Sequence, residues 1–198
     1  MATYQSIRYN VDYGGKAGSL MPLLLFTSDG SDATADFTSK IDSTYDTYMF
    51  IFNDIHPETT GKHLNFQVDT GTNTDYNQTI TSSSFKAYHQ EDDSPLELVY
   101  NGSYDQAEGT AFQNISTDII DDSDASCSGY LYLFNPASTT FVKHFMSVSN
   151  GMADGSPPYS EVRYNAGYIN TTTAITRVQF KMTSGEIQGG TIQMFGVH

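Results

Sequence analysis

The segment Tyr45–Ile55, YDTYMFIFNDI, gives the clearest structural signal in the sequence. Successive side chains of a β-strand point to opposite faces. In this segment the two sets are Tyr48, Phe50 and Phe52 on one face, and Thr47, Met49 and Ile51 on the other. Because both sets are largely apolar, we expect a central strand that is buried on two sides.

A second strand is expected at His63–Asp69, HLNFQVD, where the alternation is cleaner. Its inward side chains would be Leu64, Phe66 and Val68, and its outward ones Asn65 and Gln67. The polar set predicts that this strand has one face in water.

Short apolar runs separated by turn residues continue along the chain. Further strands are expected at Met21–Thr27, Ser84–His89, Leu96–Tyr100, Gly129–Phe134, Thr140–Val148, Val162–Tyr168, Ile175–Met182 and Thr191–Val197. No segment keeps a helical period for three turns, and Gln113–Ile120 could form one short helical turn at most. The pattern predicts an all-β chain, an antiparallel β-sandwich that is jelly-roll-like, with an N-terminal extended arm. We divide it into an arm, residues 1–19, and a single β-sandwich domain, residues 20–198.

The two C-terminal strands are expected to form a hairpin. In the first strand Val178, Phe180 and Met182 share one face, and Arg177, Gln179 and Lys181 share the other. TSGEIQGG then turns the chain, so that Thr191–Val197 returns as the antiparallel neighbour. We expect Ile192 and Met194 to point inward.

The composition limits the partners of the chain. The sequence has 9 Lys and Arg against 23 Asp and Glu, a formal net charge of −14. This charge repels nucleic-acid phosphates and anionic membrane surfaces, so we expect neither nucleic acid nor a membrane as a partner. The single cysteine, Cys127, cannot close an intrachain disulfide and is expected to be buried. The N-terminus lacks the layout of a signal peptide, which favours a protein made in the cytoplasm.

One loop resembles a calcium site in its spacing. In DTGTNTD, the residues Asp69, Gly71, Asn73 and Asp75 alternate as calcium ligands do. The glycine is in the wrong position, however, and Ile80 stands where a bidentate Glu is needed. A β-turn rich in Asp and Asn explains the same residues.

Other groups of potential ligands are weaker. We interpret DGSDATAD at residues 29–36, and Asp121, Asp122 and Asp124, as solvated loops that could bind a cation weakly. The histidines show no HxxxH or HxH spacing: His56, His63, His89, His144 and His198. We therefore predict no metal site and no cofactor.

No motif nominates a catalytic residue. The sequence has no GxSxG motif, and Cys127 lacks the local signature of a thiol nucleophile. GGKAGS at Gly14–Ser19 lacks the frame of a phosphate-binding loop. Two acids from distant segments could form a glycosidase pair, but no particular pair is singled out. We therefore predict that the chain is not an enzyme.

Four phrases of the sequence, taken together, resemble a known family: YDTYMFIFNDIHPET, GYLYLFNPASTTFVKHF, AGYINTTTAITRVQFKM and SGEIQGGTIQMFGV. They are similar to segments of small virion structural proteins of marine tailed phages. The resemblance runs from about Tyr45 to the C-terminus and leaves out residues 1–19. It implies a β-sandwich or jelly-roll module at the surface of the head or tail of a virion, often in oligomers, and no catalytic residues.

This resemblance leads to three hypotheses about function. The first is a capsid decoration, or cement, protein that binds major capsid or other virion proteins, with a homotrimer preferred by analogy with phage surface proteins. The second is a tail or head fibre module that binds a host surface glycan, with Tyr45, Tyr48, Tyr130 and Tyr132 stacking on sugar rings. Core and interface packing explains the same tyrosines. The third is a hydrolytic virion protein, for which no residues can be named.

The N-terminal arm has a pattern of its own. Its apolar residues Ile7, Tyr9, Val11 and Tyr13 alternate with polar ones. We expect these four to bind a partner by β-augmentation, in which the arm adds a strand to the edge of a neighbouring sheet. The alternative is that the segment is the first strand of the domain's own sheet.

Overall fold

The computed structural model describes residues 20–93 and 96–197, which form twelve β-strands and no helix. The strands are β1 (Leu20–Thr27), β2 (Ala35–Phe37), β3 (Thr47–Pro57), β4 (Leu64–Thr70), β5 (Ile80–Gln90), β6 (Leu96–Tyr100), β7 (Gln113–Asn114), β8 (Cys127–Phe134), β9 (Lys143–Ala153), β10 (Tyr159–Ile169), β11 (Ile175–Met182) and β12 (Ile187–Val197). Every expected strand is present, and β2 and β7 are additional. The helical turn considered at Gln113–Ile120 is wrong, because β7 pairs there with β4.

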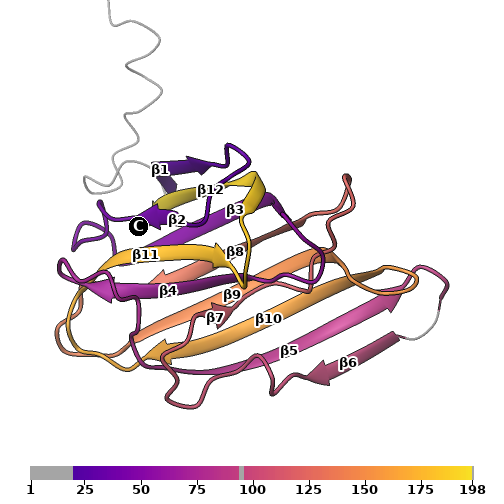
Figure 1. The fold of residues 1–198 in the computed structure, drawn as a ribbon. Helices are drawn as coiled ribbons and strands as arrows, with labels where there is room; N and C mark the ends of the chain where they lie inside the picture. Colours follow the sequence, from indigo (N-terminus) through magenta and orange to yellow (C-terminus); the bar gives the residue numbers. More distant parts are fainter. Residues whose placement is uncertain (1–19, 94–95, 198) are drawn as a thin grey trace, which may run out of the picture.

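The strands form two antiparallel sheets that pack face to face (Figure 1). The larger sheet has eight strands in the order β1-β12-β3-β8-β9-β10-β5-β6. The smaller sheet has four, in the order β2-β11-β4-β7. The prediction of an all-β antiparallel sandwich is confirmed.

A long two-stranded ribbon connects the sheets. β3, β4 and β5 pair in turn with β12, β11 and β10, so the ribbon starts in the larger sheet, crosses to the smaller one and returns. A jelly roll is wrapped in a similar way. Here the β8–β9 hairpin lies between β3 and β10, and the larger sheet has twice as many strands as the smaller.

Aromatic side chains fill the space between the sheets. Phe37 on β2, Phe50 on β3 and Phe180 on β11 are buried. The ring centroid of Phe50 lies 5.2 Å from that of Phe37 and 5.3 Å from that of Phe180, and the centroids of Phe37 and Phe180 are 5.9 Å apart. Phe66 on β4 meets Phe145 on β9 edge to face at 5.0 Å. Contacts between aromatic rings add to the gain from burying their apolar surface, and these rings join both sheets into one core.

β3 is buried on one face only. Phe50 and Phe52 are inaccessible to solvent, as expected, but Met49 and Ile51 are only half-buried on the opposite face. The expectation of burial on two sides is wrong, because among the described residues the smaller sheet covers the larger one on a single side.

β4 differs from expectation in the opposite direction, since it has no face in water. Asn65 and Gln67 are buried. The side-chain amide of Gln67 donates to the carbonyls of Gln78 and Ala111, at 3.0 Å each. Loops therefore cover this side of the smaller sheet and satisfy its buried polar side chain.

The expected C-terminal hairpin is wrong. β11 lies between β2 and β4 in the smaller sheet, whereas β12 lies between β1 and β3 in the larger one. The link at residues 183–186 crosses the sandwich, because each strand follows its partner in the ribbon. The inward residues were predicted correctly, since the buried set includes Val178, Phe180, Met182, Ile192 and Met194.

Candidate functional site

One side of the larger sheet is turned away from the smaller sheet, and we call it the outer face. Residues that are directly opposite each other in neighbouring strands place their side chains on the same side. We define the outer face by three such rows together with Leu96 and Leu98 on β6. The first row is Leu25, Gln193, Ile51, Tyr130, Val148, Tyr164, Phe85 and Tyr100. The second is Pro22, Phe195, Met49, Tyr132, Met146, Ala166 and Ser83. The third is Leu20, Val197, Thr47 and Phe134, and beyond the paired part of β8 and β9 it continues with His144, Tyr168 and Thr81.

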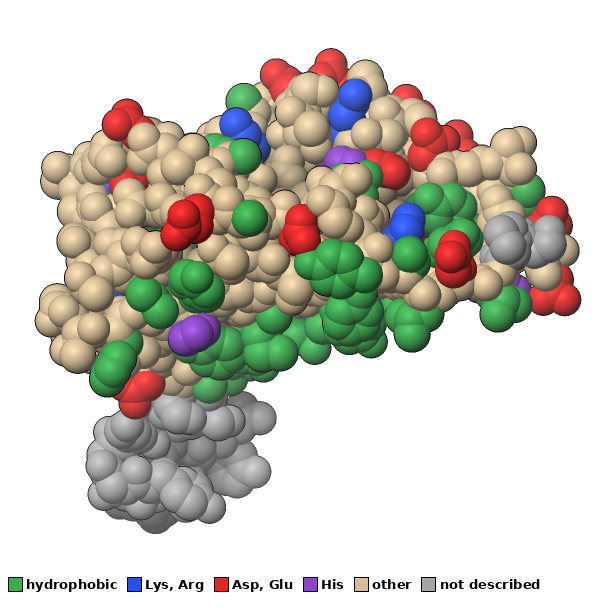
Figure 2. Space-filling model, turned by 90° about the horizontal axis from the view of Figure 1, so that it is seen from below, with side chains coloured by type: hydrophobic (Ala, Val, Ile, Leu, Met, Phe, Trp, Pro, Cys, Tyr) green, Lys and Arg blue, Asp and Glu red, His purple; other side chains and the backbone are tan. Residues whose placement is uncertain are grey.

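The outer face is apolar and free of charged residues. Its rows contain no Asp, Glu, Lys or Arg, and Leu25, Tyr100 and Met146 are 61%, 58% and 53% exposed. Figure 2 shows hydrophobic side chains gathered along the lower border of the molecule, while most acidic ones lie above that border. In a chain with a net charge of −14, a broad uncharged apolar surface indicates a place of contact with another molecule.

The middle of β10, Glu161–Asn165, carries polar residues inward and apolar residues outward. Glu161 and Arg163 are buried, whereas Val162 and Tyr164 point to the outer face. This reversal follows from the unequal sheets: no strand of the smaller sheet lies over β5 and β6 in Figure 1. Polar loop residues cover the inner side of the larger sheet there, so the polar set of β10 finds its partners inside.

The four tyrosines expected to stack on sugars do not share one site. Tyr48 is buried in the core, and Tyr45 packs edge-on against it with centroids 5.8 Å apart. Tyr130 and Tyr132 both lie on the outer face, 5.5 Å apart, and the ring of Phe134 stacks on Tyr132 at 5.9 Å. Of the four tyrosines, Tyr130 alone is exposed.

A charged cluster lies on the inner side of the larger sheet, on β5 and β10. Arg163 donates from Nε and Nη2 to Glu161 Oε1 at 3.0 and 2.6 Å, and Lys86 Nζ donates to Glu161 Oε2 at 2.7 Å. The guanidinium lies 4.1 Å from the centroid of the Tyr104 ring, and its Nη1 reaches Asn114 Oδ1 at 3.4 Å. The buried cation and the buried carboxylate therefore satisfy each other, as buried charges must.

His63 and Asp118 extend the charged cluster. His63 Nε2 is hydrogen-bonded to the Asp118 carboxylate, and the imidazole packs on the Tyr104 ring at 4.8 Å. Burial raises the pKa of Asp118, but the hydrogen bond and the charge of His63 outweigh it, so this pKa lies below its ordinary value. The Asp118 carboxylate therefore ties the loop before β8 to His63, the residue that precedes β4.

The sequence pattern does not reveal the charged cluster. Its members come from segments far apart in the chain, and spacing cannot show that they meet. The only local signal is that Glu161 and Arg163 share one face of a strand otherwise rich in aromatic residues.

Asp69 organises its own loop instead of a calcium site. Its buried carboxylate accepts at Oδ1 from the main chain of Thr70 at 2.8 Å and from the side chains of Asn73 and Gln78 at 3.1 and 3.0 Å. Oδ2 accepts from the main-chain N–H of Tyr76 at 2.9 Å. Because both oxygens are already occupied by donors, the geometry favours the turn interpretation.

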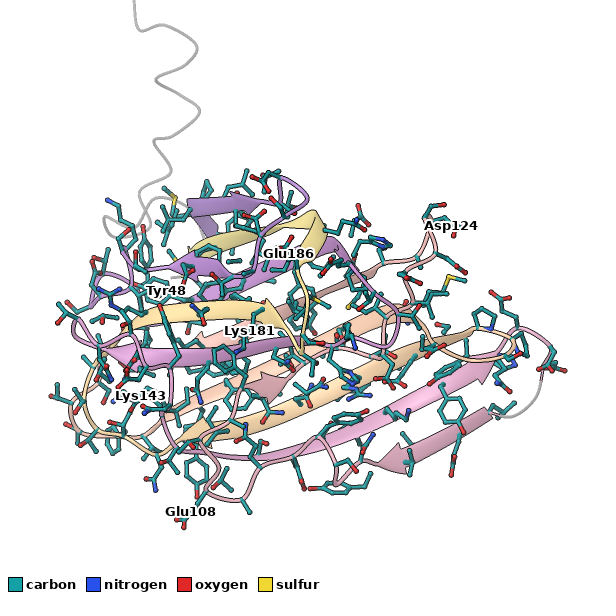
Figure 3. All side chains as sticks on the ribbon, in the orientation of Figure 1. Tyr48, Glu108, Asp124, Lys143, Lys181 and Glu186 are labelled. Carbon is teal, nitrogen blue, oxygen red and sulfur yellow. The ribbon has the colours of Figure 1, made fainter. Side chains whose placement is uncertain are left out.

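The other acidic and thiol candidates do not form a set of ligands among the described residues. Asp124 is at the tip of a loop that projects from the sheets (Figure 3), and Asp121 and Asp122 are also exposed. Cys127 is buried, and burial raises the pKa of its thiol to about 12. In the part of the chain that the structure describes, no three or more His, Cys, Asp or Glu side chains gather as metal ligands would.

The predicted partner-binding residues Ile7, Tyr9, Val11 and Tyr13 lie outside the described residues, so β-augmentation by the arm stays a prediction. Within residues 20–93 and 96–197 there is no helix of the length and apolarity needed to cross a membrane. No family model, curated protein or solved structure matches the chain.

Proposed function

We propose that this chain is a structural protein of a tailed-phage particle, a decoration or cement protein of the head surface that acts through protein–protein contacts. The observation that carries the proposal is the outer face, where eight strands present apolar side chains without a charged residue. The sequence phrases that resemble small phage virion proteins support the viral setting.

The dimensions of the outer face suit a protein partner. Eight strands about 4.8 Å apart span roughly 34 Å, and three rows about 6.8 Å apart span roughly 14 Å before side-chain width is added. With side chains included, this approaches the ~800 Å² that each partner contributes to a standard interface. Because the face is uncharged, docking would desolvate no ion, and charged residues are indeed depleted from interface cores.

The copy number in purified particles tests the proposal. We expect quantitative mass spectrometry to find the chain at a level comparable with that of the major capsid protein, because a cement protein follows the capsid lattice. Only a few copies per particle, or none, would contradict a decoration role.

Two lysine substitutions test whether the outer face is the docking surface. Met146 lies at the centre of the outer face and is 53% exposed, whereas Phe141 is 69% exposed and lies outside it. We expect Met146→Lys to be lost from particles and Phe141→Lys to be retained, with both purified variants melting like the parent chain. Equal incorporation of the two variants would show that another surface docks.

A fibre module that binds a host surface glycan is the second candidate. It is favoured by the exposed ring of Tyr130 beside Tyr132 and Phe134, because aromatic surfaces can stack on sugar rings. Binding of the purified chain to a glycan array, abolished by Tyr130→Ala, would favour this candidate over the first. The absence of any array signal would count against it.

The predicted role of the arm has its own test. Deleting residues 1–15 should leave the melting temperature unchanged but prevent the chain from joining the particle, if the arm adds a strand to a neighbour. A large loss of stability in the truncated chain would show instead that the segment belongs to the domain's own sheet.

A further inference from the structure

β6 forms one edge of the larger sheet. It is the last strand in the sheet order, and Figure 1 shows it at the lower border of the fold. Its outer-face residues Leu96, Leu98 and Tyr100 are 68%, 72% and 58% exposed. An apolar strand with a free edge is a template on which another strand can pair.

Among the described residues β5 is the one strand beside β6, and the main-chain groups of β6 alternate between β5 and the opposite edge. Asn101 N–H donates to Ser84 O at 2.9 Å, and the register runs from there along β6 without a shift. In an antiparallel pair, hydrogen-bonded and non-bonded positions alternate. Every second residue of β6 therefore turns its N–H and C=O away from β5, and those residues are Leu96, Leu98 and Tyr100.

The two edges of the larger sheet are protected differently. β1, at the opposite edge, contains Pro22 and a register shift between Pro22 and Leu24, and both features disfavour further pairing. β6 contains no proline, lysine or bulge. Its single charged side chain, Glu97, lies on the side opposite the outer face and accepts a hydrogen bond from the Tyr88 hydroxyl at 2.9 Å.

We propose that β6 pairs with β6 of a second copy of this chain, antiparallel, around a two-fold axis at Leu98. In this register Leu98 lies opposite Leu98 of the second copy. Leu96 lies opposite Tyr100 of the second copy, and Glu97 lies opposite its Val99. The outward N–H and C=O groups of the two strands then meet at every bonded position. An axis one residue away, at Glu97, would oppose two carboxylates, and like charges in that position are unfavourable.

This pairing would double the larger sheet and continue the outer face across the axis. Leu98 and Tyr100 of both copies would join the stacked rings of Phe85 and Tyr164, which are 4.8 Å apart in one chain. An isologous edge contact closes after two copies, so it gives a dimer and not the trimer expected from phage surface proteins. The inference does not depend on the proposed function, because the dimer forms in solution with or without a particle.

Sedimentation velocity of the full chain tests the dimer. An edge of five residues buries less surface than the ~1,600 Å² of a standard interface. We therefore expect a dimer that forms with increasing concentration, with a dissociation constant in the micromolar range. Leu98→Lys should remain monomeric over that range, because it places two like charges on the axis. Leu25→Lys on β1 and Met146→Lys at the centre of the outer face are matched controls and should dimerise like the parent chain.

Three outcomes would overturn the inference: a parent chain that stays monomeric, a dimer that survives Leu98→Lys, or controls that dissociate as fully as Leu98→Lys. The last outcome would point to stacking of outer faces instead of edge pairing. Because the substituted residues are more than half exposed, melting temperatures should change little, and they are measured for each variant.

A pair of opposite charges introduced at Leu96 and Tyr100 tests the register itself. Leu96→Lys and Tyr100→Glu should each weaken the dimer. The double variant places a lysine opposite a glutamate twice across the axis, so it should dimerise again. Two weakened single variants without rescue in the double variant would contradict the register centred on Leu98.

Discussion

Arg163→Met removes the buried cation of the charged cluster and keeps a long apolar side chain in its place. The guanidinium supplies two hydrogen bonds to Glu161, at 3.0 and 2.6 Å, and a longer one to Asn114 at 3.4 Å. Without it, the buried Glu161 carboxylate keeps only Lys86, at 2.7 Å, as a cationic partner. The substitution therefore leaves the Glu161 carboxylate in the interior with one of its two cationic partners removed.

The expected loss follows from the burial of both partners. The side chains of Arg163 and Glu161 are 0% and 1% exposed, and breaking such a pair from one side costs about 3–5 kcal/mol. In a domain of this size ~1 kcal/mol corresponds to about 2–4 °C, so the melting temperature should fall by roughly 6–20 °C. The double variant Arg163→Met/Glu161→Leu should lose less, because no uncompensated carboxylate remains and the Lys86 ammonium can extend towards water.

Urea unfolding at neutral pH, followed by circular dichroism, measures these differences in the free energy of unfolding. Arg177→Met on β11 is the matched control, since Arg177 is half-buried, its Nε donates to the Gly71 carbonyl at 3.2 Å, and it forms no ion pair with the described carboxylates. We expect the control to cost about 1 kcal/mol or less. A comparably small loss in Arg163→Met, or a double variant less stable than the single one, would refute the reasoning.

Three further predictions concern titration, reactivity and the facing of β3. Burial raises the pKa of the Tyr48 phenol to about 12 from 10.0. The contribution of the protonated phenol to the free energy of unfolding should therefore be complete below pH 10 and be lost as the pH rises through the folded-state pKa. In alkaline unfolding curves, Tyr48→Phe should not show this loss of stability. Cys127 is buried with a raised pKa, so a thiol reagent should modify it only as fast as the chain unfolds, and rapid labelling of the native chain would contradict its burial. Phe50→Asp should prevent folding, because an unpaired charge in the core costs several kcal/mol, whereas Met49→Asp on the outer face should still fold; equal melting temperatures would overturn the facing assigned to β3.

The sequence by itself determined the fold class and most of the core. Aromatic and β-branched residues alternate with a period of two between turn residues, and that pattern is local. It located Phe50 and Phe52 on the buried face of β3, and Phe180 on that of β11. In β11 the opposite set is polar, so neighbours in the chain distinguish its two faces, whereas in β3 both sets are apolar and the local pattern leaves the buried face open.

Only the tertiary structure decided which face of β3 and of β10 meets the core, and which strands pair. Alternation divides β10 into two sets, but the larger sheet extends beyond the smaller one, so Glu161 and Arg163 turn inward and Tyr164 outward. In the same way, the separation of β11 from β12 depends on ribbon partners that are distant in the chain. The charged cluster and the outer face both arise from this mismatch in sheet size, because the position at which one layer stops covering another is set by contacts between distant segments and not by any local pattern.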